Sequence, residues 1–440
     1  MVGRRITTGF AALAMGLGGI IGTTAVAGAG EKPPDFSKLK EIKEPANCNK
    51  PDPGITDDTI KVGVITIQSG PQGVNFAPST ENGMLARIEA ANASGELGDR
   101  KIELVVKDDQ ANQANTLTAA QQLVEEEEVF GIIEQSNVGD GSAEYLNENK
   151  IPVGGWHLGQ NVWGIYPNMF SWRNSQPPEP AETFSSRNGD VMKALGAKKI
   201  ALVGANIASS AVFIDQAGVA VENTKGIELV YKTTEVTPEQ QDFTGIAAQI
   251  KDSGADGMYT GLAGIQANAL VQAINQAGVE LKATVFPGGY DSRVTGLPGY
   301  EGAYMGTEFK PLEVGSPGLT AYEDALAAFD PELNPLNFFQ IQGYFSADIF
   351  VQGVIAAGVG CPTRKAFINN LRMVKGYDAG GSFIPVDYDE IFGRIFYCVY
   401  YVQLVDGAFI PQFDGEPLCA KKLIDGGKVS MLKKSEVATG

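Results

Sequence analysis

The side chains that could do chemistry are few, and their spacing argues against catalysis. His157 is the only histidine, so a zinc or iron site built on several imidazoles is excluded by count. No Gly-x-Ser-x-Gly turn and no phosphate loop ending in Gly-Lys-Ser/Thr occurs in the chain. Asp108 and Asp109 are adjacent, and neighbouring side chains at a strand end point to opposite faces, which disfavours paired acid/base work. The sequence therefore predicts no metal site, no cofactor and no enzyme activity.

Composition indicates a large globular protein that binds no nucleic acid. The chain has 440 residues, of which 43% are hydrophobic, so it can bury more than one ordinary domain core. Its 34 Lys and Arg residues stand against 52 Asp and Glu, a net charge of −18. A surface that negative repels phosphate backbones and anionic lipid headgroups.

The N-terminal segment is typical of an export signal. Arg4 and Arg5 precede an uncharged apolar run, and Ala25-Val26-Ala27 fits a signal peptidase site, so residues 1–27 are predicted to be removed. A membrane-spanning helix is the alternative, although the glycines in the run weaken a permanent helix. The arginine pair leaves the general secretory and twin-arginine routes both open. No cysteine follows the run, so no lipid anchor is predicted there, and the expected location is the periplasm or cell envelope.

Two segments outside the predicted core have linker or tail character. Residues 28–54 are rich in proline and charged residues and are expected to be a linker, and residues 421–440 a C-terminal tail.

Four cysteines in an exported chain favour two disulfides over free thiols, although buried reduced cysteines are the alternative. Three pairings are possible in principle. Cys398 and Cys419 flank a segment whose centre, 405–407, is a hairpin turn signal, which favours their pairing. That choice leaves Cys48 with Cys361.

Two successive runs of strands and helices predict two parallel sheets. The first run has expected strands at 59–67, 101–107, 129–133 and 151–154, and the second has them at 199–203, 227–231, 256–260 and 283–286. The proline-rich residues 175–180 separate the runs and mark a crossover. Later helices at 316–329, 344–357 and 363–374 fit back on the first lobe, and the aromatic strand at 395–401 fits on the second. We therefore assign 55–175 and 308–378 to lobe 1, and 176–307 and 379–420 to lobe 2.

Several motifs in this order resemble the type I periplasmic binding proteins of branched-chain amino acid ABC importers. They include Ile60-Lys61-Val62-Gly63-Val64-Ile65, the stretch from Gly98 to Asp109, and Gln121-Gln122-Leu123-Val124. Further markers are Gln241-Asp242-Phe243 before a helix, Gly254-Ala255-Asp256 before a strand, and Thr363-Arg364 opening a late helix. The resemblance covers about residues 55 to 415.

The resemblance implies an α/β fold of two Rossmann-like lobes joined by three hinge crossovers. It implies a small amino acid, carboxylate or amide held in an interlobe cleft without chemistry, and delivery to ABC permease subunits by a monomer. The alternatives are a ligand-sensing domain of the same fold and an exported hydrolase. The cleft position agrees with the rule that open α/β sheets bind ligands beyond the carboxyl ends of their strands.

Mapped onto this sequence, the family's ligand groups fall in loops after the strands. In lobe 1 these candidates are Gln72, Ser136, Asn137, Gly155, Trp156 and His157; in lobe 2 they are Asn206, Ser209, Leu262, Tyr290 and Asp291. In relatives an acidic group of the second lobe binds the ligand ammonium, which makes Asp291 the candidate here. The loop at 155–157 is bulkier than the family's usual version.

Each candidate also has a structural alternative. Ser136 and Asn137 could cap the next helix, and Trp156 and His157 could be packing residues. Asp291 could cap a turn or pair with Arg293, and the glycines around Gln72 could make only a tight turn.

Overall fold

The computed structural model describes residues 34–70, 72–156, 160–173, 182–237, 239–395 and 397–433. The predicted signal peptide, His157 and the proline-rich crossover at 175–180 lie outside these ranges, as does the side chain of Ser209. In this described part, no helix has the length and apolar character needed to cross a membrane.

Lobe 1 is built on a parallel sheet with the strand order β2-β1-β3-β4-β5. The strands are β1 (Thr59–Thr66), β2 (Lys101–Asp108), β3 (Gly131–Gln135), β4 (Val153–Gly155) and β5 (Met169–Ser171). Both alternating sets of β1 side chains are buried, Val62 and Val64 in one core cluster and Ile65 in another. The near-continuous apolar run of β1 thus reflects a sheet covered on both faces.

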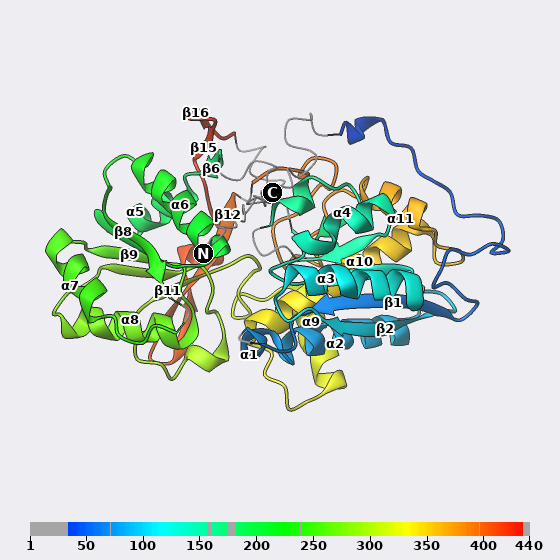
Figure 1. Cartoon of the computed structure of the whole chain (residues 1–440), viewed down its shortest axis with the longest axis horizontal. Helices are drawn as coiled ribbons and strands as arrows, with labels where there is room; N and C mark the ends of the chain where they lie inside the picture. The colour runs from blue at the N-terminus through cyan, green and yellow to red at the C-terminus, as the bar shows by residue number, and fades with distance from the viewer. Residues whose placement is uncertain are drawn as a thin grey trace, which may run out of the picture. The chain divides into compact units, whose positions relative to one another are not determined.

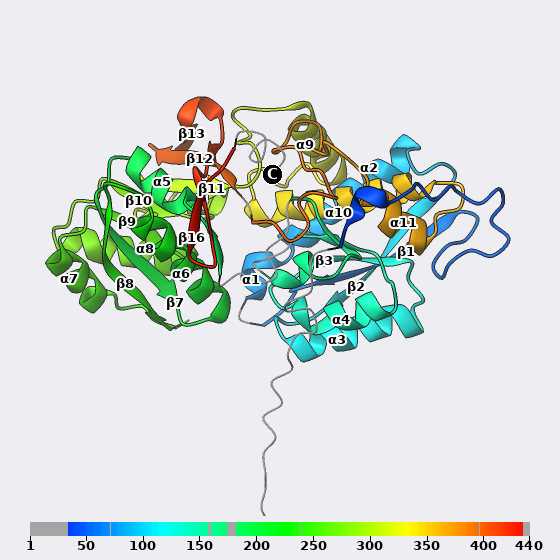
Figure 2. The same ribbon diagram turned by 90° about the horizontal axis from the view of Figure 1, so that it is seen from above.

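Helices cover the two faces of this sheet (Figures 1 and 2). On one face lie α2 (Ser79–Ser94) and α10 (Phe338–Ala357), with α9 (Pro317–Phe329) packed on α2 and α11 (Arg364–Leu371) packed on α10. On the other face lie α3 (Gln113–Gln121) and α4 (Asp140–Glu148), and a π-helical segment, Gln122–Glu126, continues α3. A short helix, α1 (Gly73–Phe76), precedes α2.

Lobe 2 repeats this order in its parallel strands, β8-β7-β9-β10-β11, and adds antiparallel strands beyond β11. The strands are β7 (Lys199–Ala205), β8 (Glu228–Val236), β9 (Gly257–Thr260), β10 (Ala283–Phe286), β11 (Tyr304–Thr307), β12 (Cys398–Val405), β13 (Ala408–Pro411) and β14 (Leu418–Cys419).

Alternate residues of β7 pack into different clusters on the two faces of this sheet. Ile200 and Leu202 pack with α5 (Arg187–Ala194) and α6 (Ala208–Glu222). Ala201 and Val203 share a core cluster with α7 (Thr244–Ser253) and α8 (Gly264–Gln276). As in lobe 1, both faces of the parallel sheet are covered by helices.

The chain crosses between the lobes three times, as the family resemblance implied. It passes from β5 of lobe 1 to α5 of lobe 2, from β11 back to α9, and from α11 to β12. β12 pairs antiparallel with β11, so the third passage returns the chain to the lobe 2 sheet, as expected from its aromatic sequence.

The segment before Ile55 is held on lobe 1, although its composition predicted a linker. Asn370 accepts a hydrogen bond from the Ile42 backbone N–H (2.8 Å) and donates one to the Ile42 carbonyl (2.9 Å). The long-range disulfide, Cys48–Cys361, fixes the same segment. The regular secondary structure of residues 34–54 is one 3-10 turn, η1 (Phe36–Lys38), and side chains of α11 bond to part of the remaining backbone.

The C-terminal segment forms a hairpin where the sequence predicted a tail. β15 (Lys422–Asp425) pairs with β16 (Lys428–Met431) and, on its other edge, with β6 (Thr183–Ser185) beside the first crossover. The hairpin disulfide, Cys398–Cys419, joins directly opposed residues of β12 and β14. The four cysteines, all within the described ranges, therefore form the two pairs that the hairpin argument favoured, in place of other pairings or free thiols.

Several element boundaries differ from the sequence prediction. β3 ends at Gln135, two residues later than expected, because Glu134 and Gln135 continue the ladder with β1. β4 extends to Gly155, and the three-residue strand β5 was not predicted. α10 begins at Phe338, six residues before the expected start, with Asn337 as its side-chain N-cap.

Candidate functional site

The strand ends of lobe 1 bring three predicted ligand residues together. Asn137, in the loop after β3, donates a hydrogen bond from Nδ2 to Oε1 of Gln72 (2.6 Å), at the N-cap of α1. The Ser136 hydroxyl accepts a hydrogen bond from the Val138 backbone N–H (3.2 Å). α4 has Gly139 at its N-cap and no side-chain cap, so neither Ser136 nor Asn137 caps that helix. Oδ1 of Asn137 is buried and lacks a partner within the described ranges.

Gly155 lets two lobe 1 segments approach closely. A Cβ at this position would lie 2.0 Å from the backbone oxygen of Glu134 and 2.9 Å from the ring of Trp163. A larger residue would push β4 away from β3. Gly155 therefore has a packing role whether or not it contacts a ligand.

Trp156, the next residue, is buried in an aromatic cluster with one polar contact. Its ring lies edge-on to Phe338 (6.0 Å between ring centroids) and Phe339 (6.4 Å) at the start of α10. Phe339 also packs on Phe76 of α1, with ring centroids 4.4 Å apart. Both phenylalanines of α10 are partly exposed. Aromatic surface is thus available at the strand ends of lobe 1.

A buried ion pair joins residues that follow the last parallel strand of each lobe. Arg173, after β5, has Nη1 2.5 Å from Oε1 of Glu308, which follows β11. The second carboxylate oxygen of Glu308 accepts a hydrogen bond from Nε1 of Trp156 (3.0 Å). The Arg173 guanidinium also lies 5.9 Å from the centroid of the Trp156 ring. These three residues link the strand ends of lobe 1 to lobe 2.

Burial governs the protonation of this pair. Burial lowers the pKa of Arg173 to about 10, with the Glu308 carboxylate opposing the shift. Burial likewise raises the pKa of Glu308, and the attraction of Arg173 and the Trp156 hydrogen bond oppose it. Arg173 stays charged at neutral pH, so the Glu308 carboxylate serves as its counter-ion.

The first two strand-end loops of lobe 2 give the candidates different surroundings. Asn206 is exposed, and its backbone N–H donates to the Val236 carbonyl (2.7 Å). Leu262 is buried in the core, with its backbone N–H donating to the Thr260 hydroxyl (3.2 Å). Ser209 lies in the first turn of α6. The structure thus places the side chain of Asn206, but not that of Leu262, where a solute could reach it.

Tyr290 is a core residue whose hydroxyl group both donates and accepts a hydrogen bond. Its O–H donates to Oε2 of Glu313 (2.6 Å) and accepts from the Leu312 backbone N–H (2.8 Å). Its ring packs against Phe309 and Phe409. The structure supports a structural role for Tyr290, and its ligand contact stays a prediction.

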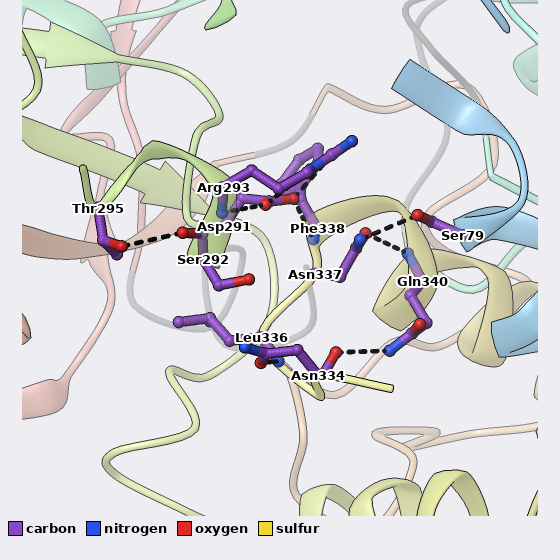
Figure 3. A network of polar contacts seen from close by, with 10 residues as sticks. All are labelled: Ser79, Asp291, Ser292, Arg293, Thr295, Asn334, Leu336, Asn337, Phe338 and Gln340. Carbon is purple, nitrogen blue, oxygen red and sulfur yellow. Dashed lines mark hydrogen bonds and ion pairs between the residues drawn. The ribbon is translucent and has the colours of Figure 1, made fainter. Parts of the chain in front are cut away.

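Asp291 is buried and surrounded by donors of the chain itself (Figure 3). Its carboxylate accepts two hydrogen bonds from the Arg293 guanidinium (2.9 Å each) and one from the Arg293 backbone N–H (2.9 Å). A fourth comes from the Phe338 backbone N–H at the start of α10 (3.0 Å). This geometry supports the alternative of a turn cap paired with Arg293, and the ammonium role of Asp291 stays a prediction.

The same network ties lobe 2 to two helices of lobe 1 (Figure 3). The Ser292 backbone N–H donates to the Leu336 carbonyl (2.9 Å). Asn337 caps α10 through its Oδ1 and donates from Nδ2 to the Ser79 hydroxyl (2.9 Å), where α2 begins. Asp291 therefore forms part of a hydrogen-bonded contact between the lobes, which the sequence alone did not indicate.

A further buried carboxyl group, that of Glu134, lies near the end of β3, just before the Ser136 loop. Burial, reinforced by repulsion from Asp109, raises the pKa of Glu134 to about 8. The Ser142 hydroxyl of α4 donates to one oxygen of Glu134 (3.3 Å). The Asp109 carboxylate, which has a raised pKa for the same reason of burial, accepts from the Thr116 hydroxyl (3.2 Å). Glu134 is therefore protonated at neutral pH.

Sequence reasoning missed Arg173, Glu308 and Glu134 for identifiable reasons. Arg173 follows a strand too short to show a pattern, and Glu134 was assigned to a loop. Only the position of Glu308 directly after an apolar strand could have drawn attention to it.

One group of three acidic side chains in the described ranges has the spacing of a metal site: Asp387, Asp389 and Glu390. All three contact the ammonium group of Lys375, which occupies the position between them. The group is an ion-pair cluster, and no metal is assigned to it.

The chain forms two Rossmann-like lobes and crosses between them three times, and polar and aromatic residues lie at the strand ends. This architecture is the type I periplasmic binding protein fold. The chain belongs to the periplasmic binding protein family, whose model matches residues 59–408. Members of this family bind small solutes and work with ABC transporter permeases.

Individual relatives are distant in sequence. The Leu/Ile/Val-binding protein homolog 3 of Brucella melitensis is 24% identical over 305 residues, which cover 68% of this chain and 79% of the relative. An R. palustris solute binding protein solved with 4-hydroxybenzoate has a TM-score of 0.64 and 24% identity, covering 81% of this chain and 96% of its own. The Streptococcus pneumoniae protein LivJ, solved with isoleucine, has a TM-score of 0.65 and 18% identity, covering 80% and 98%.

Proposed function

We propose that this protein is an exported solute receptor that captures a small amino acid or related carboxylate between the strand ends of its two lobes and delivers it to an ABC permease. The observation that carries the proposal is the contact of Trp156 and Arg173 with Glu308. It joins the carboxyl ends of the two parallel sheets, where open α/β sheets bind their ligands. No catalytic step is proposed, because the described residues of the site include no nucleophile with an adjacent base.

The surroundings of Trp156 support a ligand with an apolar or aromatic body. Phe338 and Phe339 are partly exposed beside it, and aromatic faces stack well on flat or branched apolar groups. Relatives of the same fold have been solved with isoleucine and with 4-hydroxybenzoate. Both are small carboxylates, which is the class proposed here.

Export is supported by the family and by the two disulfides. Disulfides form and persist outside the reducing cytosol, and this chain holds two. Release into an extracytoplasmic space is also what a receptor that feeds an importer requires.

Two measurements test the proposal. Mass spectrometry of the solute released by denaturing the purified protein identifies a captured ligand. Fluorescence titration with leucine, isoleucine, benzoate and 4-hydroxybenzoate should change the emission of the native protein. The change should be much smaller in Trp156→Phe, since Trp156 is the tryptophan that contacts Glu308, Phe338 and Phe339 at the strand ends. Unchanged emission with the whole panel, together with no released solute, would contradict the proposal.

A further inference from the structure

A cavity lies among the helices of lobe 1, apart from the strand ends. Its volume is about 590 Å³, within the range of small-molecule sites. Residues of α2, α9 and α10 and the loop 376–380 line it, and we call it the helix pocket. None of the candidate ligand residues at the strand ends contributes to its wall. The helix pocket and the strand-end site therefore have different lining residues.

The cation in the wall of this pocket is already neutralised. Arg87 donates from Nε to Oδ1 of Asp348 (2.6 Å) and from its two terminal nitrogens to the Glu96 carboxylate (2.7 and 3.2 Å). The other oxygen of Asp348 accepts from the Tyr377 hydroxyl (2.6 Å). Arg87 and Asp348 are both buried. An anionic ligand would have to compete with two carboxylates for this guanidinium.

The remaining charge of the pocket wall is negative. The two carboxylates of Glu96 and Asp348 and the guanidinium of Arg87 together have a net charge of −1. Asp378 adds another carboxylate to the wall, and this carboxylate has no hydrogen bond or ion pair to another residue of the described ranges. A concave site lined by excess negative charge raises the local concentration of cations. These carboxylates are absent from the one candidate metal-ligand group of the described ranges, which favours an organic cation over a metal ion.

An accessible hydroxyl in the pocket wall is available to a ligand. Tyr344 is 6% exposed and lines the pocket, and its O–H has no hydrogen-bond partner among the residues described. The oxygen is not among the buried atoms without a partner, so a polar group of a ligand can replace water as its hydrogen-bond partner. The rings of Tyr344 and Tyr377 belong to the pocket wall, and aromatic rings attract cations.

We propose that the helix pocket is a second ligand site, which binds a small organic amine in its protonated form. The ammonium group lies near Asp378 and the hydroxyl of Tyr344, and the apolar part of the amine packs against the tyrosine rings. The strand-end site, by contrast, is proposed for a carboxylate, so the two sites select ligands of different charge.

Calorimetric titration of the full mature chain with 2-phenylethylamine tests this proposal, with uncharged 2-phenylethanol as the matched control. The amine should bind at least about tenfold more tightly than the alcohol, because only the amine carries a charge. Asp378→Asn and Tyr344→Phe should each weaken amine binding by about tenfold or more. Asp378 is partly exposed, so its variant is expected to fold normally even if Tyr344→Phe does not.

Trp156→Phe serves as the control variant, since it alters the strand ends and leaves the helix pocket intact. Amine affinity should be the same in this variant as in the native protein. Ala321→Trp, which places a large side chain in the pocket wall, should abolish binding. The proposal is overturned if the alcohol binds as well as the amine, if Asp378→Asn has no effect, or if Trp156→Phe is the variant that loses the amine.

Discussion

Replacing Glu308 by glutamine tests whether the ion pair at the strand ends holds the two lobes together. The side chains of Arg173 and Glu308 are 8% and 19% exposed, so the variant leaves a buried guanidinium without its carboxylate. Removing one partner of a buried pair typically costs about 3–5 kcal/mol, because the remaining charge is desolvated without compensation. We therefore expect Glu308→Gln to lower the free energy of unfolding by about 3 kcal/mol or more.

An exposed pair in the same protein provides the control. Lys232 and Asp215 are 39% and 59% exposed, and pairs of this kind contribute about 0–1 kcal/mol. Urea unfolding of both variants at pH 7, followed by circular dichroism, should give a much larger loss for Glu308→Gln than for Asp215→Asn. Adding Arg173→Met to Glu308→Gln should recover part of the loss, since the buried charge is then removed. Equal losses in Glu308→Gln and Asp215→Asn would refute the reasoning.

Three further predictions concern stability and ligand affinity. Because the pKa of Glu134 rises from 4.5 to about 8 in the folded state, its contribution to stability is full below about pH 4.5 and is lost as pH rises toward 8. The free energy of unfolding of Glu134→Gln, relative to that of the native protein, should therefore increase across this range by up to about 1.4 kcal/mol per pH unit. If urea titrations gave the same pH dependence of stability for both proteins, the raised pKa of Glu134 would be contradicted. The long-range and hairpin disulfides span 313 and 21 residues. Loop entropy therefore predicts that replacing both cysteines by serine lowers the free energy of unfolding by about 6 kcal/mol for the long-range disulfide and about 3 kcal/mol for the hairpin disulfide. Urea unfolding measures both losses, and a larger loss for the hairpin disulfide would contradict this reasoning. If Asp291 binds the ammonium group of an aminated ligand, Asp291→Asn should weaken its affinity by about tenfold in calorimetry. An affinity within about twofold of the native protein would instead support the structural role, in which Arg293 and backbone donors already bond the carboxylate.

Most of the parallel strands, with the exception of β5 and β11, could be predicted because periodicity in the sequence is local. The two runs of strands and helices and the hairpin disulfide follow from patterns within short windows. The return of the late helices to lobe 1 was inferred from their need for a surface to cover. The end of β3 could not be found in this way. Glu134 and Gln135 are polar, yet both are fully buried in the strand, one protonated and the other bonded to Ser346 of α10. Their polar side chains indicated a loop, because a local sequence pattern does not show partners that are distant in the chain, such as Ser346.

For the candidate site residues too, contacts between near neighbours in the sequence could be predicted and contacts with distant residues could not. The pairing of Asp291 with Arg293 spans two positions and was recognised as an alternative from the sequence. The hydroxyl of Tyr290 bonds to Glu313, which is 23 positions away and lies in the second crossover, between β11 and α9. Aromatic residues in strand-end loops satisfy the requirements of a ligand wall and of a core equally well. Only the tertiary partners distinguish these two uses.

The contact between Arg173 and Glu308 has a topological origin. In lobe 1 the order β2-β1-β3-β4-β5 places β5 at one edge, and in lobe 2 the order β8-β7-β9-β10-β11 places β11 at the equivalent position. These two strands are also the ones from which the chain crosses to the other lobe. Residues immediately after them must therefore lie where the crossovers meet, however far apart they are in the sequence. A strand order alone thus indicates where interlobe contacts form, and here it selects Arg173 and Glu308, which no local motif marks.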